Sequence, residues 1–326
     1  MAQDLIDELA DGAWRLFTDD AEKWDLYSAD EHLAAGLVHA RPRETARLAD
    51  VLRGHAVLVL QPDCMAGRLA QQCLAIVRRE GFEPVHWRRV RIEPHVTAAM
   101  WRYQSSSSTR ASLVLADAIC SRDESIVVLL RDTTAVHDGP ASLRLTALKG
   151  PSDTTRRQPH QLRSVLGSPT KLVVLIHTSD EPMDMVRELA ILVPDAMEEF
   201  YEAMSGAVSP TMVASLESAV AELEARGPVH DLDLEASFDR LRGVLVERLE
   251  DGGDQSAGLR ATAGDLLERL DHAREGVEPL DWDVFASGVE AFGVDRFSWD
   301  ALVVATQLVE HDLPGVRRLL AGGGAA

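Results

Sequence analysis

The sequence predicts an α/β (α+β) protein, in which a ferredoxin-like sandwich is flanked by helical segments and followed by a C-terminal helical bundle. Between residues 55 and 205, short apolar runs alternate with amphipathic stripes, which is typical of alternating strands and helices. Residues 1–54 and 206–326 show helical stripes only. We therefore expect three domains: a helical N-terminal extension (1–54), the sandwich (55–205) and an acidic helical domain (206–326).

The N-terminal extension is expected to pack on the sandwich and to carry no chemistry of its own. Apolar residues recur at helical spacing over 5–16 and again over 29–52. Large aromatic side chains bury much apolar surface, so those of this segment are the expected anchors. They are Trp14, Phe17, Trp24 and Tyr27.

The sandwich is expected to contain four strands separated by helices. Apolar runs of strand length cover 56–60, 84–92, 126–130 and 171–176, and helical stripes cover 65–80, 94–103 and 140–149. This order suggests the ferredoxin-like arrangement, whose sheet can be antiparallel despite the alternation. The serine run at 105–108 is predicted to be a flexible loop.

The run at 171–176 leads directly to His177, the strongest functional candidate. An unbroken apolar run is typical of a strand buried on both faces, whose end delivers polar side chains to a cleft. Pro182 then opens a helical stripe that carries Glu188, eleven residues after His177. Glu188 can return to fix the imidazole tautomer, which a nucleophilic histidine requires. The alternative is a partly buried structural histidine at a strand end.

The C-terminal domain is predicted to be a small acidic bundle of helices. Further helical stripes cover 213–223, 232–249, 259–270, 282–292 and 299–309, and glycine or proline separates them.

Composition excludes several classes of partner. No stretch reaches the roughly eighteen apolar residues of a membrane span, and the N-terminus is acidic, so we expect a cytoplasmic protein without a membrane partner. The three cysteines lack metal-ligand spacing and are expected to be reduced. The net charge of −20 argues against nucleic acid. Residues 57–205, with 17 basic and 18 acidic side chains, tolerate an anionic ligand better than the acidic flanks do.

Four short motifs occur in order between about residues 56 and 195: LVLQPD at 58–63, LKGPSD at 148–153, QLRS at 161–164 and HTSD at 177–180. Together they resemble the nucleoside diphosphate kinases. The first is similar to the family's strand followed by Lys-Pro-Asp, and the second to its Gly-Pro-Thr-Asp turn. The third looks like the site of its phosphate-binding arginine. The fourth, with Glu188, looks like its His-Gly-Ser-Asp signature and following glutamate.

The resemblance implies phosphoryl transfer through a phosphohistidine. His177 would take the γ-phosphate of ATP or another nucleoside triphosphate and pass it to a nucleotide or a specialised small-molecule acceptor. Mg²⁺ would bridge the phosphates, with no protein side chain assigned as a metal ligand. The implied site residues are Glu188 and Ser179 around the histidine, Arg163, Arg144, Gln61 and Ser152 at the phosphates, and Trp101 or Tyr103 as the platform for the base. Since extensions at both ends can block the family's hexamer and tetramer surfaces, we expect a homo-oligomer smaller than a hexamer.

Several positions depart from the family pattern. Gln61 replaces a lysine, so a cation that would stabilise the transition state is missing. Thr146 stands where an arginine is expected, and Arg144 lies two residues earlier. These departures leave a second hypothesis, a non-catalytic nucleotide-binding or scaffolding protein with a degenerate kinase domain. A third is that the C-terminal helices cover the site and define the acceptor. A further cation beside His177, from Arg144, Arg156 or Lys149, would favour a kinase.

Overall fold

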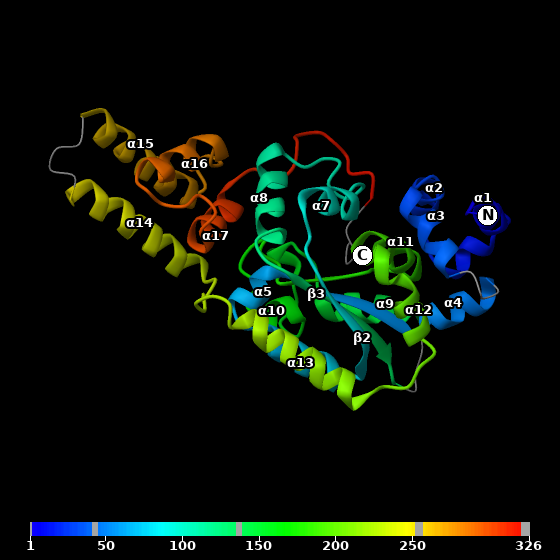
Figure 1. The fold of residues 1–326 in the computed structure, drawn as a ribbon. Coiled ribbons are helices and arrows are strands. Elements are labelled where there is room, and N and C mark those ends of the chain that lie inside the picture. Colours follow the sequence, from blue (N-terminus) through cyan, green and yellow to red (C-terminus); the bar gives the residue numbers. More distant parts are fainter. Residues whose placement is uncertain (1, 41–44, 135–138, 252–256, 321–326) are drawn as a thin grey trace.

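The computed structural model describes residues 2–40, 45–134, 139–251 and 257–320. Figure 1 shows a central sheet with its covering helices, the N-terminal helices on one side of it and the last four helices on the other. This arrangement matches the order of segments expected from the sequence.

The N-terminal segment is helical and packs on the sandwich through its aromatic side chains. Its elements are α1 (Ala2–Ala10), the 3-10 turn η1 (Ala13–Leu16), α2 (Ala21–Tyr27), α3 (Glu31–His39) and α4 (Thr45–Arg53). Trp14, Phe17, Trp24 and Tyr27 are all buried, which confirms them as anchors. Helix α3 lies against α11 so closely that a Cβ on Gly36 would stand 2.3 Å from a main-chain oxygen of α11.

The sandwich has a four-stranded antiparallel sheet in the order β2-β3-β1-β4. The strands are β1 (His55–Leu60), β2 (Phe82–Val90), β3 (Ser125–Asp132) and β4 (Ile176–Thr178). The helices are α5 (Pro62–Ala66), α6 (Ala70–Arg79), α7 (Pro94–Met100), α8 (Arg110–Cys120), α9 (Ala141–Lys149), α10 (Leu162–Val165), α11 (Pro182–Leu192) and α12 (Met197–Ala203), with 3-10 turns η2 (Thr154–Arg156) and η3 (Pro194–Ala196). The topology and the mixed α+β class confirm the predicted ferredoxin-like sandwich.

Strand β1 is buried on both faces, as its unbroken apolar run predicts. Leu58 and Leu60 join one apolar cluster, which continues into α6, α9 and the C-terminal helices. Val57 and Val59 join the other, which contains α11 and the N-terminal helices. The two flanking segments therefore extend the two apolar layers on opposite faces of one sheet.

The fourth strand is shorter than predicted and begins later. The apolar run at 171–175 is irregular, and only Ile176–Thr178 pairs with β1. Leu175 has a φ of 69°, in the left-handed region that a β-strand does not use. An apolar run does not distinguish a buried strand from a buried loop, and the hydrogen bonds of this loop go elsewhere, so the prediction of a strand over 171–176 was wrong.

The C-terminal segment contains α13 (Pro210–Glu224), α14 (Leu234–Asp251), α15 (Ala257–Arg274), α16 (Trp282–Ala291) and α17 (Trp299–Leu308). Helix α13 lies along β2, where the indole nitrogen of Trp87 donates to Ser215 Oγ at 3.0 Å. After α17 the chain returns across α8 and α7 toward α11 (Figure 1). It binds the serine run, since Leu313 N donates to Ser107 O and Ser107 Oγ to Asp312. The loop predicted to be flexible is thus held by the chain's last described residues.

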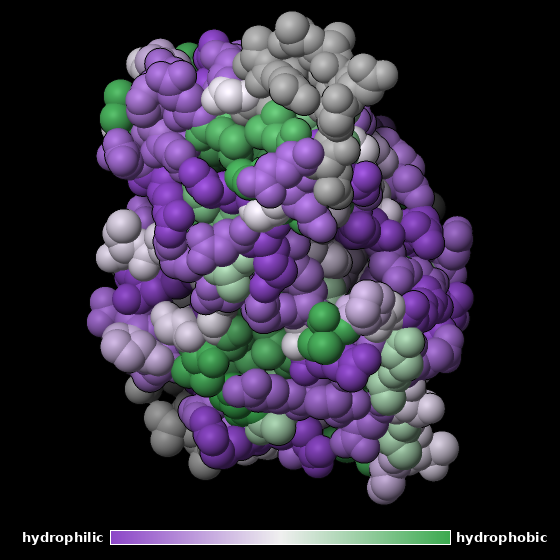
Figure 2. Space-filling model, turned by 90° about the vertical axis from the view of Figure 1, so that its left-hand side faces the viewer, coloured by the Kyte–Doolittle hydropathy of each residue, from purple (hydrophilic) through white to green (hydrophobic). Residues whose placement is uncertain are grey.

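The surface is mostly hydrophilic on the side of α14 and α15, with smaller hydrophobic areas between the helices (Figure 2). This agrees with the 10 basic and 23 acidic side chains of residues 206–326. Among the residues that the structure describes, no helix combines the length and the apolar composition needed to cross a bilayer.

Candidate active site around His177

Strand β4 and helix α11 bring His177 and Glu188 together. His177 pairs with Val59 in the sheet and therefore points to the face that α11 covers. Helix α11 starts at Pro182, where a missing N–H is tolerated, and the side chains of Glu181 and Asp184 form a capping box. Every residue of α11 is buried, so the position of Glu188 is set by packing.

Glu188 accepts two hydrogen bonds on one oxygen. His177 Nε2 lies 3.0 Å from Glu188 Oε2, and Ser179 Oγ donates to the same oxygen at 2.6 Å. Because a carboxylate oxygen only accepts, Nε2 carries a proton, and in the neutral imidazole Nδ1 then keeps its lone pair. The Trp101 ring meets the imidazole edge-on, with centroids 5.5 Å apart and planes at 87°. The four predicted residues His177, Glu188, Ser179 and Trp101 form one cluster, in which the histidine side chain is 13% exposed.

Lys149, a candidate cation beside His177, is already paired with Asp180. Lys149 Nζ donates to Asp180 Oδ1 at 3.2 Å and to Thr178 O at 3.4 Å. Burial lowers the pKa of Lys149, and Asp180 offsets part of that effect. Thr146, at the position where the family has an arginine, hydrogen-bonds Thr178 Oγ1 at 2.8 Å instead. A cation from outside the signature motif does reach the segment after His177, but its charge serves Asp180.

Arg163 and Gln61 are buried and face protein groups. Arg163 donates to Gly150 O and to Ile176 O, both at 2.9 Å, and its side chain reaches these carbonyls from α10. Desolvation lowers the pKa of Arg163 to about 9, and Arg157 adds to this shift. Gln61 Nε2 donates to Cys120 Sγ at 3.4 Å, and Gln61 Oε1 is buried with no hydrogen-bond partner among the residues that the structure describes. The hydrogen bonds of both side chains thus go to groups other than the side chains of the His177 cluster.

Three other predicted residues lie away from the histidine or act through main-chain atoms. Arg144 pairs with Asp132 at 2.7 Å, at the end of the sheet opposite His177. Tyr103 is buried and donates to Asp30 Oδ2 at 2.8 Å, so of the two platform candidates only Trp101 contacts the imidazole. The carbonyl of Ser152 accepts from Arg157 at 2.7 Å.

Two buried groups near the site were not identified from the sequence as site residues. Asp63 is fully buried, and its Oδ2 accepts from Leu175 N at 2.8 Å. Arg187, next to Glu188 in the sequence, pairs with Asp30 at 2.9 Å with both side chains completely buried. The Pro-Asp sequence indicates only a local helix cap, because a partner more than a hundred residues away leaves no local pattern.

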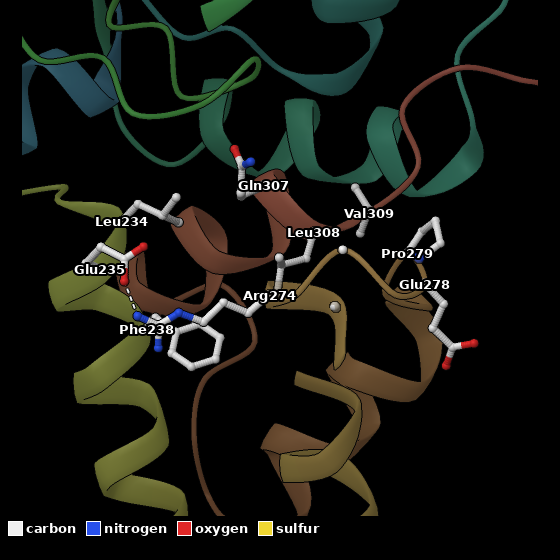
Figure 3. A pocket seen from close by; sticks show the side chains of 11 residues that line it. Leu234, Glu235, Phe238, Arg274, Glu278, Pro279, Gln307, Leu308 and Val309 are labelled. Atoms are coloured by element: carbon white, nitrogen blue, oxygen red, sulfur yellow. Dashed lines mark hydrogen bonds and ion pairs between the residues drawn. The ribbon is translucent and has the colours of Figure 1, made fainter. Parts of the chain in front are cut away.

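The part of the chain that the structure describes contains no group of three or more His, Cys, Asp or Glu side chains that could hold a metal ion. A hollow of about 460 Å³ lies among α14, α15 and the end of α17, away from His177 (Figure 3). Arg274 lies over the Phe238 ring there and pairs with Glu235. The charge of Arg274 is therefore already paired within the hollow.

Comparison with known proteins finds similarity of fold. No family model matches the chain, and no curated protein matches its sequence. Among solved structures, the nucleoside diphosphate kinase of Aquifex aeolicus is 18% identical, covering 42% of this chain and 92% of its own, with a TM-score of 0.35. The nucleoside diphosphate kinase of Encephalitozoon cuniculi is 13% identical, covering 44% of this chain and 91% of its own, with a TM-score of 0.36. The enzyme of Halobacterium salinarum, solved in complex with CDP, is 16% identical, covering 45% of this chain and 97% of its own, with a TM-score of 0.34.

Proposed function

We propose that this protein transfers a phosphoryl group through His177, from a nucleoside triphosphate such as ATP to a nucleotide or a specialised small-molecule acceptor. The observation that carries the proposal is that Glu188 Oε2 accepts from both His177 Nε2 and Ser179 Oγ. This contact places the proton of a neutral imidazole on Nε2 and leaves Nδ1 free to attack. Nδ1 would attack the γ-phosphorus as the bond to the β-phosphate oxygen breaks. The acceptor oxygen would then attack the phosphohistidine and restore the imidazole.

The chain's residues have separable parts in this reaction. When Nδ1 bonds to phosphorus the ring becomes cationic, and Glu188 would stabilise that charge through Nε2–H. Trp101, beside the ring, would limit the approach of water and offer an apolar surface to the nucleotide base. Mg²⁺ would be held by the phosphates and would neutralise the charge that develops on them.

A second candidate is a nucleotide-binding or scaffolding protein without catalysis. The partners of the nearby cations favour it. Arg163 already donates to two main-chain carbonyls, and Lys149 already pairs with Asp180. Phosphoryl transfer needs cationic donors aimed at the transferred group, and removing one such donor commonly costs about 10²–10³ in rate. In this case the nucleotide binds but no phosphohistidine forms.

Labelling separates the two candidates. The protein is incubated with γ-labelled ATP and Mg²⁺, beside His177→Asn and the control His160→Asn, which alters an exposed histidine. Acid-labile label on the wild type and the control, but not on His177→Asn, is the expected result. Binding of ATP without labelling of the protein would replace the first candidate by the second. A protein that neither binds ATP nor takes up label would refute both candidates.

The proposal extends to the setting of the protein. We infer a cytoplasmic protein that binds neither membranes nor nucleic acid, since its net charge of −20 repels anionic surfaces. We also infer a homo-oligomer smaller than a hexamer, because α1–α4 and α13–α17 cover both sides of the sandwich. Light scattering coupled to gel filtration gives the mass of the assembly and tests this inference.

A further inference from the structure

The main chain that delivers His177 adopts a conformation that needs support. Leu175, two residues before the histidine, has a φ of 69°, a left-handed conformation that is unfavourable for a residue with a Cβ because Cβ is crowded against neighbouring main-chain atoms. Strand β4 has only three residues, all paired with β1 alone. Three paired residues supply few hydrogen bonds to fix the register of β4, and a slip of one residue reverses which face each side chain points to. After such a slip, His177 would point away from Glu188.

Two buried side chains of opposite charge hold this segment. Asp63 Oδ2 accepts from Leu175 N at 2.8 Å, and its Oδ1 accepts from Cys64 N at 3.1 Å, so both oxygens are tied. Arg163 donates to Ile176 O and to Gly150 O, which links the residue before His177 to the turn after α9. The main chain of Gln61 completes the support, since its N–H donates to Leu175 O at 3.1 Å.

We propose that Asp63 and Arg163 are positioning residues for His177, acting through the main chain of residues 175 and 176. Their contacts block the slip of β4, because a shift of one residue would separate the Leu175 N–H from Asp63 and the Ile176 carbonyl from Arg163. The guanidinium of Arg163, predicted from the sequence to bind phosphate, therefore supports His177 through the carbonyl of Ile176. This inference rests on the proposed function for its catalytic meaning, whereas the orientation of the ring can be measured without any activity.

The test compares Asp63→Asn and Arg163→Lys with Asp132→Asn. An asparagine keeps one acceptor oxygen but turns an NH2 group toward one of the two N–H donors. A lysine has one nitrogen in place of the two guanidinium nitrogens that donate separately to Gly150 O and Ile176 O. Asp132 is a matched control, a buried carboxylate that accepts from Arg144 and Thr134 at the other end of the sheet. Its loss reduces stability without touching the support of β4.

The readout is the ¹⁵N spectrum of histidine-labelled protein, with the His177 signals assigned by difference from His177→Asn. In the wild type the two ring nitrogens should be well separated, as expected for a single neutral tautomer. We expect the separation to shrink in Asp63→Asn and Arg163→Lys and to persist in Asp132→Asn. Phosphohistidine formation should fall about 10²-fold in the first two variants, the effect of a misplacement of roughly 1 Å.

Each outcome decides the proposal. Unchanged ring signals in folded Asp63→Asn and Arg163→Lys would overturn it, and so would an equal change in Asp132→Asn, which would indicate a general loss of stability. If Asp63→Asn does not fold, Arg163→Lys decides alone. A wild type that takes no label while the ring signals respond as expected would refute the proposed function and leave the positioning roles intact.

Discussion

Removing one partner of the buried ion pair between Asp30 and Arg187 should strongly lower the stability of the fold. Arg187 Nε donates to Asp30 Oδ2 at 2.9 Å, and its other nitrogens donate to Met100 O at 3.2 Å and Ala99 O at 2.5 Å. Both charged side chains are completely buried, and the guanidinium also lies over the ring of Tyr27. The pair joins the start of α3, the end of α7 and α11, which carries Glu188.

Replacing Arg187 by methionine keeps most of the apolar stem and removes all three hydrogen bonds. Asp30 is then a buried carboxylate without its counter-ion, and two carbonyl groups lose their donors. Breaking a buried pair from one side costs about 3–5 kcal/mol, which we expect as the loss in free energy of unfolding at pH 7. In Asp30→Asn/Arg187→Met both charges are gone, so the loss should be smaller than the sum of the two single losses.

The pH dependence adds an independent check. Burial would raise the pKa of Asp30, but Arg187 and the hydrogen bonds from Tyr103 and His32 hold it below its usual value. Without the guanidinium, burial dominates and the pKa of Asp30 rises above that of the unfolded chain. A carboxyl group of raised pKa destabilises the fold above that pKa and is relieved as the pH falls. The stability difference between Arg187→Met and wild type should therefore narrow between pH 7 and pH 4.

Urea unfolding followed by tryptophan fluorescence and circular dichroism measures these differences. The control is Arg274→Met, which breaks an exposed pair with Glu235 and should cost no more than about 1 kcal/mol. A loss below about 1 kcal/mol for Arg187→Met, or one that stays constant down to pH 4, would show that Asp30 is not a stabilised buried charge.

Three further predictions follow from the same structure. Glu188→Gln should lower labelling of His177 about 10²–10⁴-fold, because an amide NH2 can donate to Nε2 and favour the wrong tautomer; equal labelling rates would contradict this. Gly36→Ala should cost about 1–3 kcal/mol in urea unfolding, since its Cβ meets a main-chain oxygen at 2.3 Å, whereas Gly243→Ala, with open space in α14, should be neutral or stabilising. Burial lowers the pKa of His55 to about 4, so below about pH 6.5 the unfolded chain takes up a proton at this histidine before the folded protein does. This difference lowers the free energy of unfolding by about 2 kcal/mol at pH 5. His55→Gln should remove that loss, which is measured as the pH dependence of the urea midpoint.

Local patterns were sufficient for most elements of the fold. The apolar run of β1 is short and bounded by Gly54 and Pro62, which favours a buried strand. The last four helices lie within a few residues of their predicted bounds, because their stripes are long and glycine or proline separates them. The contact between Glu188 and His177 could also be predicted from the sequence. The two residues are only eleven apart, and the turn and helix between them can bring the two side chains together.

The same reasoning did not succeed where the partner of a residue lies far away in the chain, or where one side chain suits more than one kind of partner. The run at 171–175 has the composition of a strand, but its backbone bonds go to Asp63 and Gln61. Arg163 has the position of a phosphate ligand in the resemblance, yet two carbonyls occupy it. A guanidinium is satisfied equally by carbonyl and phosphate oxygens, so its sequence position cannot say which of them it meets.

The sequence by itself determined most of the long helices, three of the four strands, the acidic flanks and the pairing of His177 with Glu188, since each depends on composition or on residues close together in the chain. Helix α8 was not predicted. Only the tertiary structure decided how that pair is supported. Asp63, Arg163 and the Asp30–Arg187 pair act across 112, 13 and 157 residues of sequence, and each is a polar group whose energy depends on burial. Burial and long-range partners arise when the layers pack, and no local pattern encodes them.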